Sequence, residues 1–141
     1  MHIKIRNNIQ VETTGGLLVE QAWLQYASGP LLREPNLINL GEKIHLHLII
    51  QGWLGEGEAG QEQIRVGAAQ RIITDEGQCF LNEADLFAAY GYFPLRAVEK
   101  ISLSAIVENI DRLVDEFRVD FRIWSKIHPD QAIQGYYSCH L

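Results

Sequence analysis

Strict alternation between apolar and polar residues constrains this chain more than any other feature of its sequence. Successive side chains of a β-strand point to opposite faces, so a strand with one buried face shows this period of two. Stretches with the pattern recur along the chain, at residues 2–6, 21–26, 43–50, 64–72, 101–108, 117–124 and 133–141. One solvated face per strand is typical of antiparallel sheets, whereas parallel sheets are covered on both faces. The pattern therefore predicts an antiparallel β protein.

The same parity predicts which side chains form the core. Ile3, Ile5 and Leu141 fall on the apolar parity at the two ends of the chain, and Trp23 falls on the outward parity. Two central strands supply the residues that we expect to be buried most deeply, namely Ile44, Leu46, Leu48, Phe117, Val119, Phe121 and Ile123.

Turn-forming residues separate the alternating stretches. Thr14-Gly15-Gly16 and Ser28-Gly29-Pro30 border the second stretch, and Asp75-Glu76-Gly77 suits a tight hairpin. His128-Pro129-Asp130 lies between the last two stretches, with Pro and Asp at the central positions of a type I turn. Short strands with turns at this spacing predict an all-β, antiparallel, immunoglobulin-like sandwich of seven or eight strands.

One segment departs from the alternation and predicts a short helix near residues 83–90. The side chain of Asn82 can cap its first turn, and Asp85 stands three residues later, as in a capping box. Gly91 is suited to end the helix. We expect its apolar residues to pack on an open end of the sandwich; they are Leu86, Phe87 and Tyr90.

Length and charge limit the classes of protein to consider. A chain of 141 residues predicts one domain, spanning residues 1–141. Its 12 Lys and Arg against 18 Asp and Glu disfavour nucleic acid as a partner, because phosphate binding needs a basic face. No apolar run approaches the roughly 18 residues of a membrane span. The amino terminus lacks the apolar segment of a signal peptide, which predicts a cytoplasmic location by default, with an exported mature protein as the alternative.

The two cysteines, Cys79 and Cys139, lack the CxxC spacing of redox and zinc motifs. Both fall on the apolar parity of their predicted strands. This favours two buried free thiols, and the alternative is one structural disulfide in an oxidising compartment.

Residues that could carry catalysis or bind a metal do not assemble into a motif. His45 and His47 share a face of one strand at a spacing that can bracket a metal, but no third zinc ligand is identifiable. The sequence contains no GxSxG, SxxK or HExxH motif. Glu116 and Asp120 alternate with arginines, which indicates charge pairing across strands. We therefore expect no cofactor, no tightly bound metal and no enzymatic activity.

Aromatic residues outside the predicted core are the strongest functional signal. Trp124 and Tyr136 fall on the outward parity of the last two strands, and Trp53 lies in a predicted loop. We expect the last two strands to form a hairpin that places Arg122 and Trp124 on the same face as Tyr136. Aromatic and arginine side chains are enriched at interaction hot spots, so these four are the candidate binding residues.

This face predicts a non-catalytic binding or accessory domain that presents a sheet surface to a protein partner, including a second copy of itself. The surface lacks the lysines that often protect an exposed edge. The alternative is a module that binds carbohydrate or another small ligand by stacking exposed aromatics on it. A concave pocket with converging titratable groups would indicate an enzyme instead.

Three segments give the chain a familiar layout. They are Leu40-Gly41-Glu42-Lys43-Ile44, Asp75-Glu76-Gly77 followed by Asp85-Leu86-Phe87, and Phe121-Arg122-Ile123-Trp124. From Gly41 onward, this layout resembles small bacterial immunoglobulin-like β-sandwich proteins of unassigned function. The resemblance implies the sandwich fold and a bacterial source, and it implies no catalytic residues.

Overall fold

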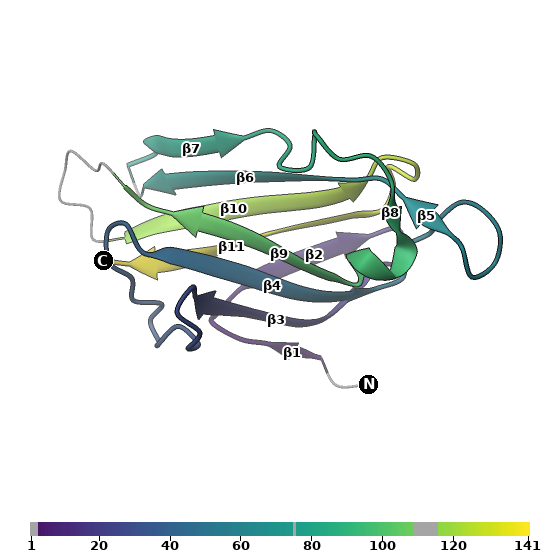
Figure 1. The fold of residues 1–141 in the computed structure, drawn as a ribbon. Helices are drawn as coiled ribbons and strands as arrows, with labels where there is room; N and C mark the ends of the chain where they lie inside the picture. Colours follow the sequence, from purple (N-terminus) through teal and green to yellow (C-terminus); the bar gives the residue numbers. More distant parts are fainter. Residues whose placement is uncertain (1–2, 75, 109–115) are drawn as a thin grey trace.

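The computed structural model describes residues 3–74, 76–108 and 116–141 (Figure 1). Within these ranges the chain forms one 3₁₀ helix, η1 (Leu95–Val98), and eleven strands. The strands are β1 (Lys4–Ile5), β2 (Gln10–Thr14), β3 (Leu18–Tyr26), β4 (Lys43–Gln51), β5 (Gln63–Ile64), β6 (Val66–Thr74), β7 (Cys79–Glu83), β8 (Phe93–Pro94), β9 (Lys100–Ile106), β10 (Glu116–Ser125) and β11 (Ala132–His140).

Two sheets stack face to face. The four-stranded sheet has the order β1-β3-β4-β9, the five-stranded sheet has the order β2-β11-β10-β6-β7, and β5 pairs with β8. Figure 1 shows β3, β4 and β9 crossing in front of β2, β11 and β10. The predicted all-β architecture is confirmed, and eight of the described strands have five or more residues. Among the described ladders, β1–β3 is parallel, so the fold is not wholly antiparallel as predicted.

The core lies between the two sheets and confirms the predicted parity. The seven side chains expected to be inward on β4 and β10 are all buried, and they belong to one cluster with residues of β6, β9 and β11. Burial of a large apolar side chain stabilises the fold by roughly 1.5–3 kcal/mol. Gln70 on β6 is polar and also buried, and its Nε2 donates a hydrogen bond to the carbonyl oxygen of Ser104 on β9, 2.8 Å away. This hydrogen bond links the two sheets.

At the two ends of the chain, the burial predicted from the apolar alternation is wrong. Ile3, Ile5 and Leu141 are 60%, 39% and 39% exposed. β1 has two residues and lies at the edge of the four-stranded sheet, so little of the opposite sheet covers it. Leu141 follows the last residue of β11. Alternation predicts the direction of a side chain, whereas burial also needs a neighbour on that side.

Both predicted hairpin turns join antiparallel strands. Gln131 N donates to the carbonyl oxygen of His128 across Pro129 and Asp130, at 2.9 Å, between β10 and β11. Between β6 and β7, Gly77 N donates to the carbonyl oxygen of Thr74, also at 2.9 Å. Gly77 has a φ of +85°, which glycine adopts at little cost. Asp75, which we expected in this turn, lies outside the described residues.

The helix predicted near residues 83–90 is wrong. Asn82 pairs with Arg71 and Glu83 pairs with Gln70 in the β6–β7 ladder, so Asn82 cannot cap a helix. The chain then makes hydrogen-bonded turns, in which Ala88 N donates to the carbonyl oxygen of Asp85 and Tyr90 N to that of Phe87. The local capping signal is overridden by strand pairing with a distant segment.

Asp85 has a tertiary role in place of the predicted capping role. Its Oδ1 accepts hydrogen bonds from the backbone N–H groups of Ala68 and Phe87, and its Oδ2 lies 2.6 Å from Lys126 Nζ. Burial raises the pKa of this carboxyl, but the hydrogen bonds from Lys126, Ala68 and Phe87 outweigh burial and hold it below its ordinary value. Asp85 thereby joins the segment after β7 to β6 and to the β10–β11 turn.

The two cysteines differ in environment, which corrects the prediction that both are buried. Cys139 on β11 is buried, and Cys79 on β7 is exposed. Burial raises the pKa of Cys139 to about 12. β6 and β10 lie between β7 and β11 in the sheet, so the two thiols are separated by three strand spacings, roughly 14 Å. That separation excludes a disulfide between them, because bonded cysteines have Cα atoms less than about 7 Å apart.

One buried glutamine holds together the loops at one end of the sandwich. Gln131, which is 1% exposed, accepts a hydrogen bond at Oε1 from Leu54 N at 2.9 Å. Its Nε2 donates to the carbonyl oxygens of Gly15 at 2.9 Å and Gly52 at 2.7 Å. The side chain therefore connects the β2–β3 turn, the segment after β4 and the β10–β11 turn.

Candidate functional site: a polar groove

The β10–β11 hairpin places three of the four candidate binding residues on one outer face. Its ladder pairs Arg122 with Gln134 and Asp120 with Tyr136, as the parity predicts. Trp124 stands farther along β10, opposite Ala132.

A groove of about 680 Å³ crosses this outer face, and every strand of the five-stranded sheet contributes to its lining. The volume lies within the roughly 300–1,000 Å³ of ordinary ligand pockets. Arg122 and Tyr136 line it, whereas Trp124 and Trp53 do not. Other polar lining residues are Gln10 and Glu12 from β2, Gln70 and Arg71 from β6, Asn82 and Glu83 from β7, and Asp120 and Gln134 from the hairpin.

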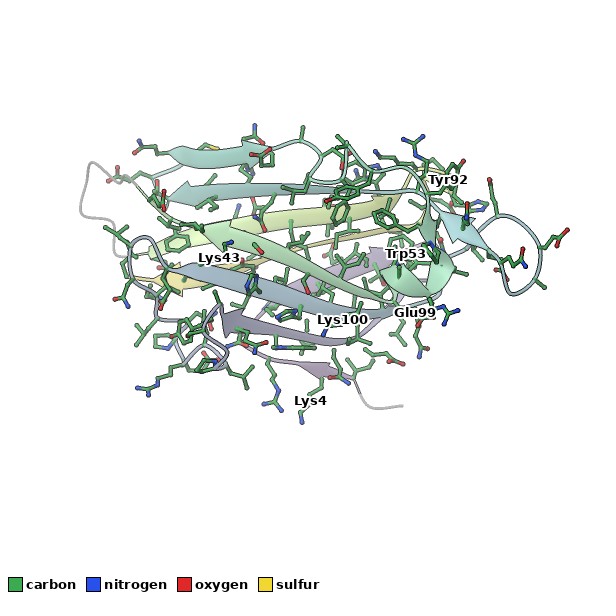
Figure 2. All side chains as sticks on the ribbon, viewed as in Figure 1. Lys4, Lys43, Trp53, Tyr92, Glu99 and Lys100 are labelled. Carbon is green, nitrogen blue, oxygen red and sulfur yellow. The ribbon has the colours of Figure 1, made fainter. Side chains whose placement is uncertain are left out.

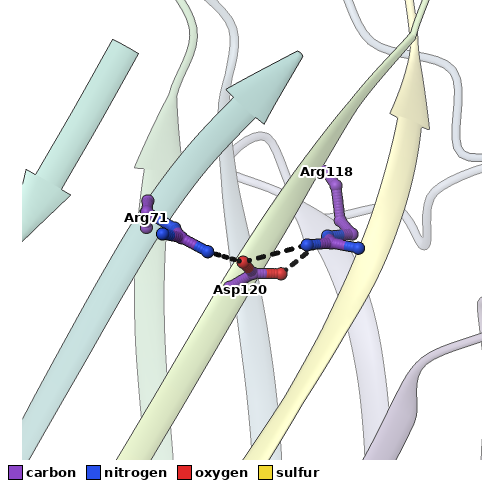
Figure 3. A network of polar contacts seen from close by, with 3 residues as sticks. All are labelled: Arg71, Arg118 and Asp120. Atoms are coloured by element: carbon purple, nitrogen blue, oxygen red, sulfur yellow. Dashed lines mark hydrogen bonds and ion pairs between the residues drawn. The ribbon is translucent and has the colours of Figure 1, made fainter. Parts of the chain in front are cut away.

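A charged network joins β6 and β10, and two of its three residues, Arg71 and Asp120, line the groove. Asp120 Oδ2 is 2.8 Å from Arg71 Nη2, and Asp120 Oδ1 is 2.8 Å from Arg118 Nε (Figure 3). The hydrogen bond and the negative charge of Asp120 raise the pKa of Arg71, which keeps this guanidinium charged. The exposed pairs add little to stability, but they fix where the charges in the groove stand.

Trp124 contacts both β6 and Arg122. The indole of Trp124 lies against β6 at Gly67, where an added Cβ would approach Trp124 Cζ2 to 2.3 Å. The Arg122 guanidinium carbon lies 5.0 Å from the centroid of the Trp124 ring, within cation–π range. Trp124 is therefore half-buried, and its contribution to the groove is to hold Arg122.

Tyr136 is the aromatic residue that the groove presents to solvent. It is 42% exposed, and the guanidinium carbon of Arg118 lies 5.1 Å from its ring centroid. Arg118 thereby contacts both Tyr136 and Asp120. The outward position predicted for Tyr136 is confirmed.

The exposure predicted for Trp53 is wrong. Trp53 does lie outside the strands, after the end of β4, but it is only 7% exposed. Its Nε1 donates to the carbonyl oxygen of Val98 in η1, 3.0 Å away, and Figure 2 shows it beside this helix. The alternation did not predict η1, and so it did not predict that the loop would be covered.

The sequence analysis did not identify the lining residues that β2, β6 and β7 contribute to the groove. Gln10 and Glu12 belong to β2, which follows no clear apolar alternation, and Asn82 was assigned to the helix that does not form. Arg71 is on the outward parity of β6, so its direction could have been predicted. Its place beside Asp120 depends on the pairing of β6 with β10, which are far apart in the sequence.

The outer face of the four-stranded sheet carries a second group of outward residues. The rings of Trp23 and His47 stack with centroids 5.1 Å apart, which confirms the outward parity of Trp23. Burial, followed by the charges of Lys100 and His45, lowers the pKa of His47. In the described part of the chain, no three His, Cys, Asp or Glu side chains gather as metal ligands.

A search for membrane spans and three comparisons with known proteins complete the description of the chain. No helix in the described ranges has the length and apolar character needed to cross a bilayer. No family model matches the sequence, and no curated protein matches it. Among solved structures, the fold is similar to the crystal structure of the C-terminal domain of Wzt, with a TM-score of 0.57 at 12% identity, covering 99% of this chain and 81% of that chain. At that identity the likeness concerns the fold, and it agrees with an all-β architecture.

Proposed function

We propose that this chain is a non-catalytic binding domain whose groove holds a carbohydrate or a similarly polar small ligand. The observation that carries the proposal is the groove of about 680 Å³, to which all five strands of one sheet contribute. A concave surface of this volume suits a ligand that enters it, whereas a flat sheet face would suit a second protein surface.

The chemistry of the groove matches a ligand rich in hydroxyl groups. The amides of Gln10, Asn82 and Gln134 each offer both donors and acceptors, and Arg122 offers a fork of donors. Neighbouring sugar hydroxyls also donate and accept. The exposed ring of Tyr136 adds an apolar surface with a polar tip, on which the C–H face of a sugar ring can pack.

Two features support binding without large rearrangement. Asp120 forms ion pairs with Arg71 on one side and Arg118 on the other, and the Trp124 ring contacts the guanidinium group of Arg122. Side chains that are already in place lose little conformational entropy when a ligand arrives, so less of the interaction energy is lost.

The titratable groups in the groove favour binding over catalysis. No Ser, Thr, Cys, Lys or His is among its described lining residues, so the lining offers neither a hydroxyl or thiol nucleophile of those types nor a histidine base. Both carboxylate oxygens of Asp120 contact arginines, and arginine keeps its proton at ordinary pH. The other two carboxylates of the lining, Glu12 and Glu83, belong to β2 and β7, which are the opposite edge strands of the five-stranded sheet, so they do not form a close acid–base pair. This supports the expectation of a non-catalytic protein.

A protein partner, including a second copy of this chain, is the second candidate. Tyr136, Arg118 and Arg122 on the outer face have the composition of interaction hot spots. Sedimentation of the wild type and of a Trp124→Ala, Tyr136→Ala variant tests self-association, because dimerisation through this face would disappear in the variant. We also retain the immunoglobulin-like class as a proposal, based on the two stacked sheets.

The test of the main proposal is a screen against a panel of neutral and acidic oligosaccharides, followed by calorimetric titration of each glycan that binds. We expect at least one glycan to bind, and Arg122→Ala and Tyr136→Ala each to weaken it about tenfold or more. Gln21→Ala, at an exposed position on the four-stranded sheet, is the matched control and should bind as the wild type does. A panel without any binder, or groove variants that bind normally, would contradict the proposal.

A further inference from the structure

Two histidines on the outer face of the four-stranded sheet are held by serines of the neighbouring strand. His45 and His47 lie on β4, and the ladder places Ser104 and Ser102 directly opposite them on β9. His45 Nδ1 is 2.7 Å from Ser104 Oγ, and His47 Nδ1 is 2.6 Å from Ser102 Oγ. The same ring nitrogen of each histidine is therefore occupied, which leaves Nε2 of both for another partner.

The two imidazole rings lie close together. Side chains two residues apart on a strand start about 6.7 Å apart, but the centroids of the His45 and His47 rings are 5.8 Å apart. Trp23 stacks on His47 from β3 and restricts that ring further, with centroids at 5.1 Å. His45 is thus positioned by a serine of β9, and His47 by a serine of β9 and the indole of Trp23 on β3.

We propose that His45 and His47 together form a surface site for one divalent transition-metal ion, held by both Nε2 atoms. Two imidazoles on one ion, with metal–nitrogen distances of about 2.0–2.1 Å, have ring centroids roughly 5–6 Å apart. The separation of 5.8 Å matches this spacing. With Nε2 on the metal, Nδ1 keeps its proton and donates it to serine, the kind of outer contact that orients metal-binding histidines.

The ligand set determines which ions bind and how tightly. Imidazole nitrogen favours Cu²⁺, Ni²⁺ and Zn²⁺ over Mg²⁺ and Ca²⁺, and Cu²⁺ binds more tightly than Zn²⁺ at such sites. No third His, Cys, Asp or Glu of the described ranges completes the set, so water fills the other positions and the ion exchanges readily. An exchangeable ion at the surface is compatible with the expected lack of a tightly bound cofactor.

Lys100 provides a charge test of the same site. Lys100 is labelled in Figure 2, and its Nζ lies 5.9 Å from the centroid of Trp23, the ring that stacks on His47. A neighbouring positive charge repels a divalent cation, and at an exposed site the effect is modest. Removing the charge should therefore tighten metal binding.

The experiment is calorimetric titration of the full chain with Zn²⁺, after treatment with chelator and its removal. We expect one ion per chain, and about tenfold or greater weakening in either His45→Gln or His47→Gln. Replacing both serines, in Ser102→Ala, Ser104→Ala, should weaken Zn²⁺ binding by roughly tenfold, because each ring loses the contact that orients it. Lys100→Gln should bind Zn²⁺ about twofold to fivefold more tightly.

The control variant replaces the other three histidines, His2, His128 and His140, with glutamine and should retain the wild-type affinity for Zn²⁺. Circular dichroism verifies that each variant is folded. Zn²⁺ binding that persists in both His45→Gln and His47→Gln, that disappears in the three-histidine control, or that is undetectable in the wild type would overturn the proposal. The histidine site lies on the four-stranded sheet, whereas the groove lies on the five-stranded sheet. The result of the Zn²⁺ titration therefore does not decide whether the groove binds oligosaccharide.

Discussion

Replacing Gln131 by leucine should destabilise the fold far more than its position near a hairpin turn suggests. Leucine has a similar size but cannot bond with Leu54 N or with the carbonyl oxygens of Gly15 and Gly52. The three loops lose their common partner at once, while the apolar side chain itself is compatible with the buried position.

The magnitude follows from how closely these loops approach one another. Three hydrogen bonds at about 1 kcal/mol each give about 3 kcal/mol. A Cβ at Gly15 would stand 2.7 Å from the carbonyl oxygen of Asp130, and one at Gly52 would stand 2.6 Å from that of Gly16. Such close backbone contacts leave little room for water to replace the lost partner, and an unsatisfied buried group costs about 1–3 kcal/mol. We therefore expect a loss of about 4–6 kcal/mol.

Urea titration followed by tryptophan fluorescence measures this loss as a change in the free energy of unfolding. The matched control is Gln134→Leu, the same substitution three residues away on the exposed face of β11, and it should change stability by less than about 0.5 kcal/mol. A loss below about 1 kcal/mol in Gln131→Leu, or equal losses in the two variants, would refute the assignment of Gln131 as the connection between the loops.

Three further predictions concern the core, a thiol and an ion pair. Phe121→Ala should cost roughly 3–5 kcal/mol because it leaves a cavity. Arg122→Ala should cost only about 0.5–1 kcal/mol, the size of its exposed contact with the Trp124 ring, so equal losses in denaturant titration would contradict the assigned faces. Because burial raises the pKa of Cys139 to about 12, iodoacetamide at pH 8 should leave this thiol unmodified in the native protein and modify it in urea; peptide mass spectrometry detects either result. The pKa of Asp85 is lowered in the fold, so its interaction with Lys126 stabilises the protein above about pH 4 and is lost as the pH falls through the folded-state value. The difference in Tm between wild type and Asp85→Asn should shrink in that range, and a difference that is constant from pH 7 to pH 2 would be inconsistent with this role.

The sequence by itself determined the direction of side chains within the long strands. Period-two alternation is a local property, so it predicted Phe121 inward and Tyr136 outward without knowledge of the neighbouring strands. The β10–β11 hairpin was also predictable, because Pro129 and Asp130 specify a turn between adjacent strands. For this reason three of the four candidate binding residues were correctly placed on one outer face.

The tertiary structure decided every feature that depends on segments distant in the sequence. Asn82 has a helix-capping side chain, yet pairing with β6 makes it part of a strand. Trp53 is buried because η1, more than 40 residues later, provides a carbonyl group for its indole. The groove needs β2, β6 and β7 beside the hairpin, and no local pattern indicates which strands become neighbours. Local periodicity indicates toward which face of the sheet a side chain points. The residues beside it depend on the order of the strands in the sheet, and that order is determined by the packing energy of the whole core.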